Sequence, residues 1–121
     1  MKKSIGLVAH DEKKELLTEW CLNHRDQLSQ LELFATGTTG KSIIDKTGLE
    51  ITLLKSGPLG GDAQLGSMIV EKKLDGLIFF IDALAAMPHD VDVKALVRLA
   101  TLYDVPFACN QSTADAVLSL F

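Results

Sequence analysis

Short, almost continuous apolar runs alternate along this chain with segments whose apolar residues recur at helical spacing. The run at residues 4–9 (SIGLVA) is nearly free of polar residues, which is typical of a strand buried on both faces of a sheet. From Glu12 the period changes, and Leu17, Trp20 and Cys21 fall on one face of a predicted helix. This alternation limits the chain to folds in which each strand is followed by a helix.

The same alternation continues to the end of the chain. Further strands are predicted at residues 31–36, 50–56, 76–82 and 105–110. A helix is predicted after each of these strands. The first follows a turn at residues 37–40 and ends near Gly48, and the second ends near Leu74. The third is capped by Asp90, and the last begins at Ser112. We therefore expect an α/β fold over residues 1–121, a single-domain three-layer sandwich with a five-stranded parallel sheet of the Rossmann-like or flavodoxin-like kind.

Composition and charge exclude several classes of protein. The 121 residues are 47% hydrophobic, which argues against disorder, and the net charge of −4 with no basic stripe argues against nucleic-acid binding. No stretch approaches a membrane span, and the apolar run near the start is too short for a signal-peptide core. Cys21 and Cys109 form no CxxC motif and are predicted to be free thiols. We expect a cytoplasmic protein that does not act on membranes.

A polar cluster follows the predicted end of every strand. These clusters are His10 with Asp11, residues 36–40, residues 56–62, Asp82 with residues 89–92, and Asn110. Ligands of parallel α/β sheets bind outside the carboxyl ends of the strands, so we expect the clusters to share one edge of the sheet. The histidines show no HxH or HxxxH spacing, and no metal site is predicted.

The segment at residues 35–42 (ATGTTGKS) has three interpretations. Its glycines, its threonine hydroxyls and its place before a helix suit a phosphate, with Lys14 as a nearby cation. The same residues could form a capped glycine turn that binds nothing. The segment also nearly matches the P-loop GxxxxGK[ST], with Lys41 in register but Ala35 at the first glycine position.

Three titratable residues stand out at the same edge. Asp62 follows a glycine-rich run (SGPLGGD) at the predicted start of a helix, where it could cap the helix or act as a general base. His10 and His89 lie in loops beside aspartates, and each could cap a turn or serve a carbonyl oxygen. His24 closes an amphipathic helix face and is predicted to be structural.

Five blocks, VAHDEKK, ATGTTG, SGPLGGDAQLG, FFIDALAAMPHDVDVKALVRLAT and STAD, occur in this order and together resemble methylglyoxal synthase over nearly the whole chain. The resemblance implies a methylglyoxal synthase-like fold and a carbon–oxygen lyase that converts dihydroxyacetone phosphate to methylglyoxal and inorganic phosphate, without a metal or other cofactor. It also implies a cytoplasmic homohexamer inhibited by phosphate. The sequence departs from the family pattern at Ala63 and Ala83.

The resemblance also assigns roles to individual residues. It implies that Asp62 is the catalytic base, that Asp92 tunes or shares its proton, and that His89 serves the reaction as well. The substrate contacts that it implies are His10, Lys14, Thr36, Gly37, Thr38, Thr39, Ser56, Gly57 and His89. Asp11 and Asp82 match further acidic positions of the family's site.

Two alternatives remain open from the sequence. The same fold resembles the allosteric domain of carbamoyl-phosphate synthetase, which binds effectors such as phosphate compounds and performs no chemistry. A binding module needs only the phosphate site, so Asp62, His10 and His89 together favour the enzyme. A nucleotide hydrolase would instead depend on Lys41 rather than Lys14.

Overall fold

One parallel sheet of five strands organises the protein. The computed structural model describes residues 2–85 and 90–121, of which residues 90–92 are described by their backbone alone. The strands are β1 (Ser4–Ala9), β2 (Glu32–Thr36), β3 (Ile51–Leu54), β4 (Gly76–Phe80) and β5 (Phe107–Ala108). They pair in the order β3-β2-β1-β4-β5, with every pairing parallel. The predicted fold class is confirmed.

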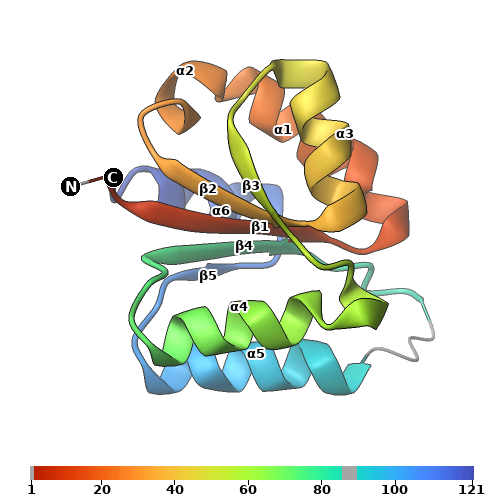
Figure 1. Ribbon diagram of the computed structural model, residues 1–121, viewed down its shortest axis with the longest axis vertical. Coiled ribbons are helices and arrows are strands. Elements are labelled where there is room, and N and C mark those ends of the chain that lie inside the picture. Colours follow the sequence, from red (N-terminus) through yellow and green to blue (C-terminus); the bar gives the residue numbers. More distant parts are fainter. Residues whose placement is uncertain (1, 86–89) are drawn as a thin grey trace.

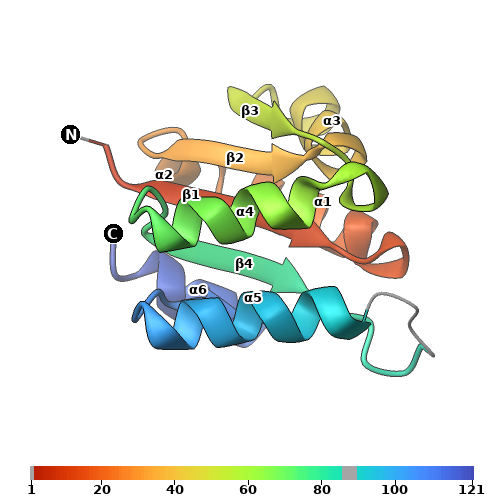
Figure 2. The same ribbon diagram turned by 60° about the horizontal axis from the view of Figure 1, so that its bottom comes forward.

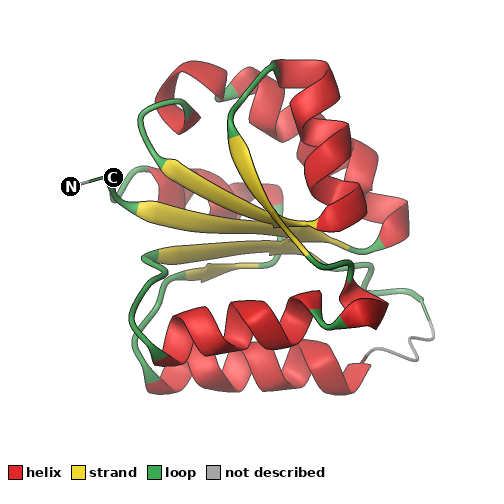
Figure 3. Ribbon diagram, in the orientation of Figure 1, coloured by secondary structure: helices red, strands yellow, loops and turns green. Residues whose placement is uncertain are grey.

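Helices cover both faces of this sheet and complete the three layers (Figure 1 and Figure 3). The α-helices are α1 (Lys14–Asn23), α2 (Arg25–Leu28), α3 (Gly37–Thr47), α4 (Gly61–Val70), α5 (Asp90–Leu102) and α6 (Gln111–Leu118). Two short 3₁₀ helices, η1 (Asp11–Lys13) and η2 (Gly57–Leu59), precede α1 and α4. Helices α1, α2, α3 and α6 pack on one face, and α4 and α5 pack on the other.

The central strand β1 separates two hydrophobic cores. All six of its residues are buried. Ile5 and Leu7 pack with Leu17 and Trp20 of α1 in one core, while Val8 packs with α4 and α5 in the other. Burying one such side chain stabilises the fold by about 1.5–3 kcal/mol. Because both faces of β1 are buried, the run at residues 4–9 is apolar at successive positions, as predicted for such a strand.

The prediction of a turn at residues 37–40 is wrong. Helix α3 begins at Gly37, so the glycines belong to its first turn. A Cβ atom on Gly40 would lie 2.3 Å from a methyl group of Leu53 and 3.1 Å from the Ala35 Cβ. Gly40 therefore allows the helix to pack closely on the sheet, a requirement that the local sequence does not reveal.

Two helix ends also differ from the prediction. Helix α4 ends at Val70 rather than near Leu74, and Lys72 beyond it adopts a positive φ of 60°. Helix α6 is capped by Asn110, whose side chain accepts a hydrogen bond from the Thr113 backbone N–H at 3.0 Å, rather than opened by Ser112. Asparagine is a strong N-cap residue, so the cap lies two residues earlier than predicted.

Both thiols are free, as predicted, with Cys21 buried and Cys109 half-buried. Burial raises the pKa of Cys21 to about 12 and also raises the pKa of Cys109. Within residues 2–85 and 90–121, none of the helices has the length and apolar character needed to cross a membrane.

All five strands are parallel, so their carboxyl ends meet at one edge of the sheet. The strands labelled in Figure 2 point in the same direction. We call this edge the carboxyl edge. The first turns of α1, α3 and α4 begin there, directly or through a short 3₁₀ helix after β1 and β3. The fold thus places several backbone N–H groups and helix starts around one space.

Candidate active site

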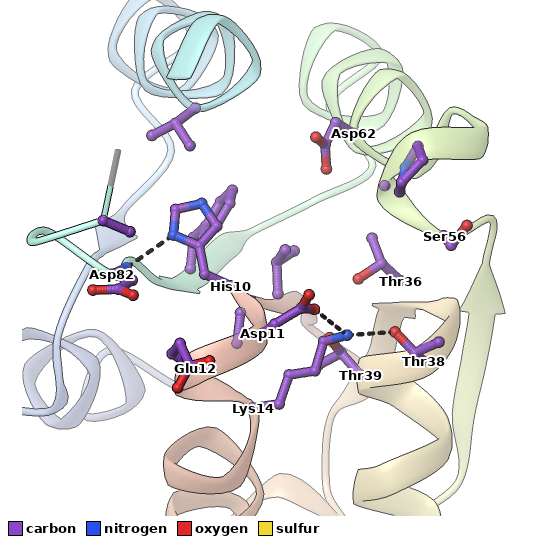
Figure 4. A pocket seen from close by; sticks show the side chains of 17 residues that line it. His10, Asp11, Glu12, Lys14, Thr36, Thr38, Thr39, Ser56, Asp62 and Asp82 are labelled. Carbon is purple, nitrogen blue, oxygen red and sulfur yellow. Dashed lines mark hydrogen bonds and ion pairs between the residues drawn. The ribbon is translucent and has the colours of Figure 1, made fainter. Parts of the chain in front are cut away.

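A cavity of about 670 Å³ opens at the carboxyl edge (Figure 4). Its lining comes from the ends of β1, β2 and β4, from the segment that follows β3, and from helices that follow these strands. The cavity brings together eight of the predicted site residues: His10, Lys14, Thr36, Thr38, Thr39, Ser56, Gly57 and Asp62. Asp11 and Asp82 line it as well.

Lys14 is the first residue of α1 and directs its ammonium group toward the start of α3. Its Nζ lies 2.8 Å from Asp11 Oδ1 and donates a hydrogen bond to Thr38 Oγ1 at 2.6 Å. The side chain is 26% exposed and lines the cavity. A cation held in this way suits a phosphate group.

The start of α3 supplies the second part of an anion site. Thr36 precedes the helix in an extended conformation, and within the described residues its side chain does not cap the helix. The side chains of Thr36, Thr38 and Thr39 all line the cavity. The first backbone N–H groups of a helix favour an anion, and Lys14 adds a full positive charge beside them. The arrangement favours anion binding over the simple capped turn.

Asp62 is the second residue of α4 and does not cap that helix, because the N-cap position is Gly60 with φ of 107°. The half-buried side chain extends into the cavity (Figure 4). A Cβ atom on Gly57 would lie 3.9 Å from both carboxylate oxygens. A Cβ atom on Gly61 would lie 2.0 Å from the Lys55 carbonyl oxygen, so only glycine allows α4 to start this close to the segment that follows β3.

His10 follows β1 directly and is held from two sides. Its backbone N–H donates to the Phe80 carbonyl at 3.1 Å, and its Nδ1 accepts from the Asp82 backbone N–H at 2.8 Å. The edge of the ring meets Phe79 at a centroid distance of 5.1 Å. Because Nδ1 is an acceptor, the proton of the neutral ring lies on Nε2. The imidazole is thereby oriented as a hydrogen-bond donor.

Comparisons with known proteins agree with this geometry. A family model described as "MGS-like domain" matches residues 17–109. A methylglyoxal synthase of Proteus mirabilis (strain HI4320) is 57% identical over 118 residues, which cover 98% of this chain and 78% of that protein. A methylglyoxal synthase of Yersinia enterocolitica is 55% identical over 117 residues, which cover 97% of this chain and 77% of that protein. The chain belongs to the methylglyoxal synthase family.

A solved structure supports the same assignment for the fold. The crystal structure of methylglyoxal synthase from Elizabethkingia anophelis NUHP1 superposes with a TM-score of 0.92 at 51% sequence identity. The match covers 98% of this chain and 78% of that chain. The predicted resemblance to methylglyoxal synthase is confirmed.

The remaining predicted site residues have mixed outcomes. Gly37 does not line the cavity, but a Cβ atom there would lie 3.4 Å from the Ser56 backbone nitrogen, so it lets two lining segments approach. His89 and the side chain of Asp92 lie outside the described residues. The roles of these residues remain predictions.

Several lining residues were missed from the sequence. They are Val8, Ala9, Glu12, Pro58, Phe79, Ala85 and Val93. Glu12 and Pro58 adjoin predicted site residues, so proximity in the sequence could have suggested them. Phe79 lies inside an apolar strand, and the sequence around it gives no sign that its ring supports His10.

The P-loop interpretation is wrong for this methylglyoxal synthase family member. Lys41 is exposed on α3 and does not line the cavity, whereas Lys14 does. His24 is structural, as predicted: its Nδ1 lies 2.8 Å from the Trp20 carbonyl oxygen and its ring packs on Trp20 with a centroid distance of 4.6 Å. In the part of the chain that the structure describes, there is no group of three or more His, Cys, Asp or Glu side chains that could hold a metal ion.

Proposed function

We propose that this chain converts dihydroxyacetone phosphate to methylglyoxal and inorganic phosphate. One observation carries the proposal beside the family membership. The carboxylate of Asp62 and the hydrogen-bonded pair Lys14–Thr38 line the same cavity. A base and an anion site that share one space can act on a small phosphorylated substrate with a proton next to a carbonyl group.

We propose that the phosphate group binds at the start of α3. Lys14 Nζ would supply a charged donor, and the hydroxyl groups of Thr38 and Thr39 with the first N–H groups of the helix would supply neutral donors. Ser56 and Gly57 also line the cavity, and Ser56 lies beside the start of α3, since a Cβ atom on Gly37 would lie 3.4 Å from its backbone nitrogen. This placement leaves the triose carbons toward Asp62.

The proposed chemical step begins with the Asp62 carboxylate. It removes a proton from the hydroxymethyl carbon, and the electron pair of the C–H bond forms the double bond of an enediolate. His10 Nε2–H donates to the oxygen that gains negative charge, which stabilises the intermediate without transferring its own proton. We propose that His89 also serves the carbonyl oxygen and that Asp92 tunes or shares the proton of the base.

Phosphate loss completes the proposed reaction. The enediol hydroxyl gives its proton to the departing phosphate, the double bond shifts toward the phosphate-bearing carbon, and the C–O bond breaks with both electrons on that phosphate. The resulting enolate of methylglyoxal takes back at its terminal carbon the proton that Asp62 removed, so one substrate gives two products and the atoms balance. Lys14 stabilises the charge on the departing phosphate, and the fixed phosphate position holds the C–O bond out of the enediolate plane.

The regulatory alternative explains less of the site. An effector-binding domain like that of carbamoyl-phosphate synthetase would use the Lys14–Thr38 site in the same way. It would not need a half-buried carboxylate opposite that site or an imidazole oriented by a backbone N–H. The described residues supply a base and hydrogen-bond donors for the proposed reaction.

We also propose that residues 1–121 form one domain and that the chain assembles as a homohexamer in the cytoplasm, where phosphate inhibits it. Exposed apolar side chains in the described part of the chain, including Leu59, Leu102 and Leu120, would become covered on association. Light scattering on the purified protein tests the assembly. A monomer at micromolar concentration would refute it.

The proposed activity is tested by incubating the purified protein with dihydroxyacetone phosphate and measuring methylglyoxal and inorganic phosphate separately. We expect the two products in equal amounts, and no loss of activity after treatment with a chelator. Formation of glyceraldehyde 3-phosphate without phosphate release would identify an isomerase instead. Phosphate binding with no turnover would identify the regulatory alternative.

A further inference from the structure

We infer that Asp82 is a positioning residue that fixes the tautomer of His10 through a turn of the backbone. The inference rests on the proposed function, because it explains how the imidazole becomes a neutral donor in that reaction. Asp82 follows β4 and lies beside His10 at the carboxyl edge of the sheet (Figure 4). The inference concerns the side chain of Asp82, although the atom that contacts His10 is its backbone N–H.

The backbone after β4 folds into a turn that the Asp82 side chain holds. Asp82 Oδ1 accepts a hydrogen bond from the Leu84 backbone N–H at 3.3 Å. The Asp82 carbonyl accepts from the Ala85 backbone N–H at 3.4 Å. The first contact is an Asx turn and the second closes a four-residue turn around it. Both hydrogen bonds restrain the backbone that directly follows the Asp82 N–H.

The two central residues of this turn contribute no restraint of their own. Ala83 and Leu84 are neither proline nor glycine, so their intrinsic dihedral preferences do not select the turn. Leu84 is 98% exposed, so its side chain does not anchor the segment by packing. Within the described residues, the Asp82 carboxylate is therefore the side chain that selects this local conformation.

The strand register brings the turn to His10. Strand β1 pairs with β4 up to Ala9 and Phe80, and the His10 N–H continues the ladder to the Phe80 carbonyl. With the His10 backbone fixed, the 2.8 Å contact from the Asp82 N–H to Nδ1 orients the ring together with the contact to Phe79. A proton on Nδ1 would face that N–H and lose the hydrogen bond, so the neutral ring carries its proton on Nε2.

The tautomer has a chemical consequence. Only a ring with Nε2–H can donate from Nε2 to the oxygen of an enediolate. If the turn loosens, the Nδ1–H tautomer becomes accessible and the donor at Nε2 is lost in part of the molecules. Asp82 thus acts on the reaction through His10 and does not contact the reacting atoms itself.

The variants Asp82→Ala and Asp82→Asn distinguish a role of Asp82 in holding the turn from a direct role of its negative charge in the reaction. Asparagine keeps the oxygen that accepts from the Leu84 N–H, whereas alanine removes it. Each variant is labelled with ¹⁵N, and the protonation of the His10 ring nitrogens is read by NMR at about pH 8, where a histidine of ordinary pKa is neutral. The spectrum of His10→Gln assigns the His10 signals, and circular dichroism confirms that each variant folds.

We expect Nδ1 of His10 to be unprotonated in the wild type and in Asp82→Asn, and the two tautomers to be mixed in Asp82→Ala. We expect kcat to fall about tenfold in Asp82→Ala, with KM changed less than twofold and a smaller loss in Asp82→Asn. A protonated Nδ1 in the wild type would overturn the inference. Unchanged tautomers in Asp82→Ala, or equal tautomer mixing in both variants, would overturn it as well. The NMR result requires no turnover, so it stays separate from a failure of the proposed function.

Discussion

Lys14 and Thr38 lie 24 residues apart in the chain, and their side chains meet at 2.6 Å between the first turns of α1 and α3. The contact joins the polar segments that follow two neighbouring strands, β1 and β2. Asp11 holds the same ammonium group at 2.8 Å from the other side. The site thus keeps a cation in place for an anionic group before any ligand arrives.

Removing the Lys14 cation should weaken phosphate binding. We expect Lys14→Ala to raise KM for dihydroxyacetone phosphate by about 10- to 100-fold, because a hydrogen bond to a charged group contributes about 1.5–3 kcal/mol. Inhibition by inorganic phosphate should weaken in parallel. Steady-state kinetics with and without phosphate provide the measurement.

Lys41→Ala is the matched control, since Lys41 is also a lysine near the start of a helix but is exposed and outside the cavity. Its KM should stay within about twofold of the wild type, within the range of ordinary surface substitutions. If Lys14→Ala keeps the wild-type KM, Lys14 does not contact the substrate phosphate.

A methyl group at Gly61 should destabilise the fold. Its Cβ atom would lie 2.0 Å from the Lys55 carbonyl oxygen, a contact that the backbone must move to relieve. We expect Gly61→Ala to lower the free energy of unfolding by about 2 kcal/mol, as for other overpacked positions. Gly57→Ala, whose Cβ atom would lie 3.9 Å from its nearest neighbours, should change it by less than about 0.5 kcal/mol. Urea titrations compare the two, and equal stabilities would disprove the close contact.

The fold could be predicted from the sequence because the patterns that indicate its strands and helices lie within short segments of the chain. The period of the apolar residues distinguishes strands such as residues 4–9 from the helix through Leu17 and Trp20, and alternation of the two implies the parallel sheet. The edge of the sheet at which ligands bind follows from strand direction alone. Lys14 and Asp62 could therefore be assigned to one space without coordinates.

The sequence could not reveal features that depend on distant backbone atoms. Gly40 lies in the first turn of α3, where an added Cβ atom would lie 2.3 Å from a methyl group of Leu53, although the sequence near Gly40 resembles a turn. The tautomer of His10 depends on the backbone of Asp82, which is 72 residues away. Such requirements arise from tertiary packing, which periodicity does not encode.

Burial of Cys21 should make stability depend on alkaline pH. Burial raises the pKa of its thiol from 9.0 to about 12, so above pH 9 the unfolded chain releases a proton that the folded chain keeps. The stabilisation is complete below pH 9 and is lost as the pH rises toward 12, by at most about 1.4 kcal/mol per pH unit.

Cys21→Ala lacks this thiol and isolates its contribution from those of other groups. Unfolding in urea is measured for both proteins across the alkaline range, and the difference between their free energies of unfolding is plotted against pH. We expect the wild type to lose stability more steeply than the variant above pH 9. Parallel curves would mean that the thiol ionises equally well in the folded chain.

The central claim is that Asp62 is the base in a cavity that binds phosphate independently of it. The most direct test is Asp62→Asn, assayed for methylglyoxal and phosphate release from dihydroxyacetone phosphate, with inorganic phosphate binding measured by calorimetry on the same sample. The variant keeps the shape of the side chain and removes its basicity. We predict at least about a 10³-fold loss of both products, near the middle of the range for a general base, together with a phosphate Kd within about threefold of the wild type. Product formation at the wild-type rate would contradict the account.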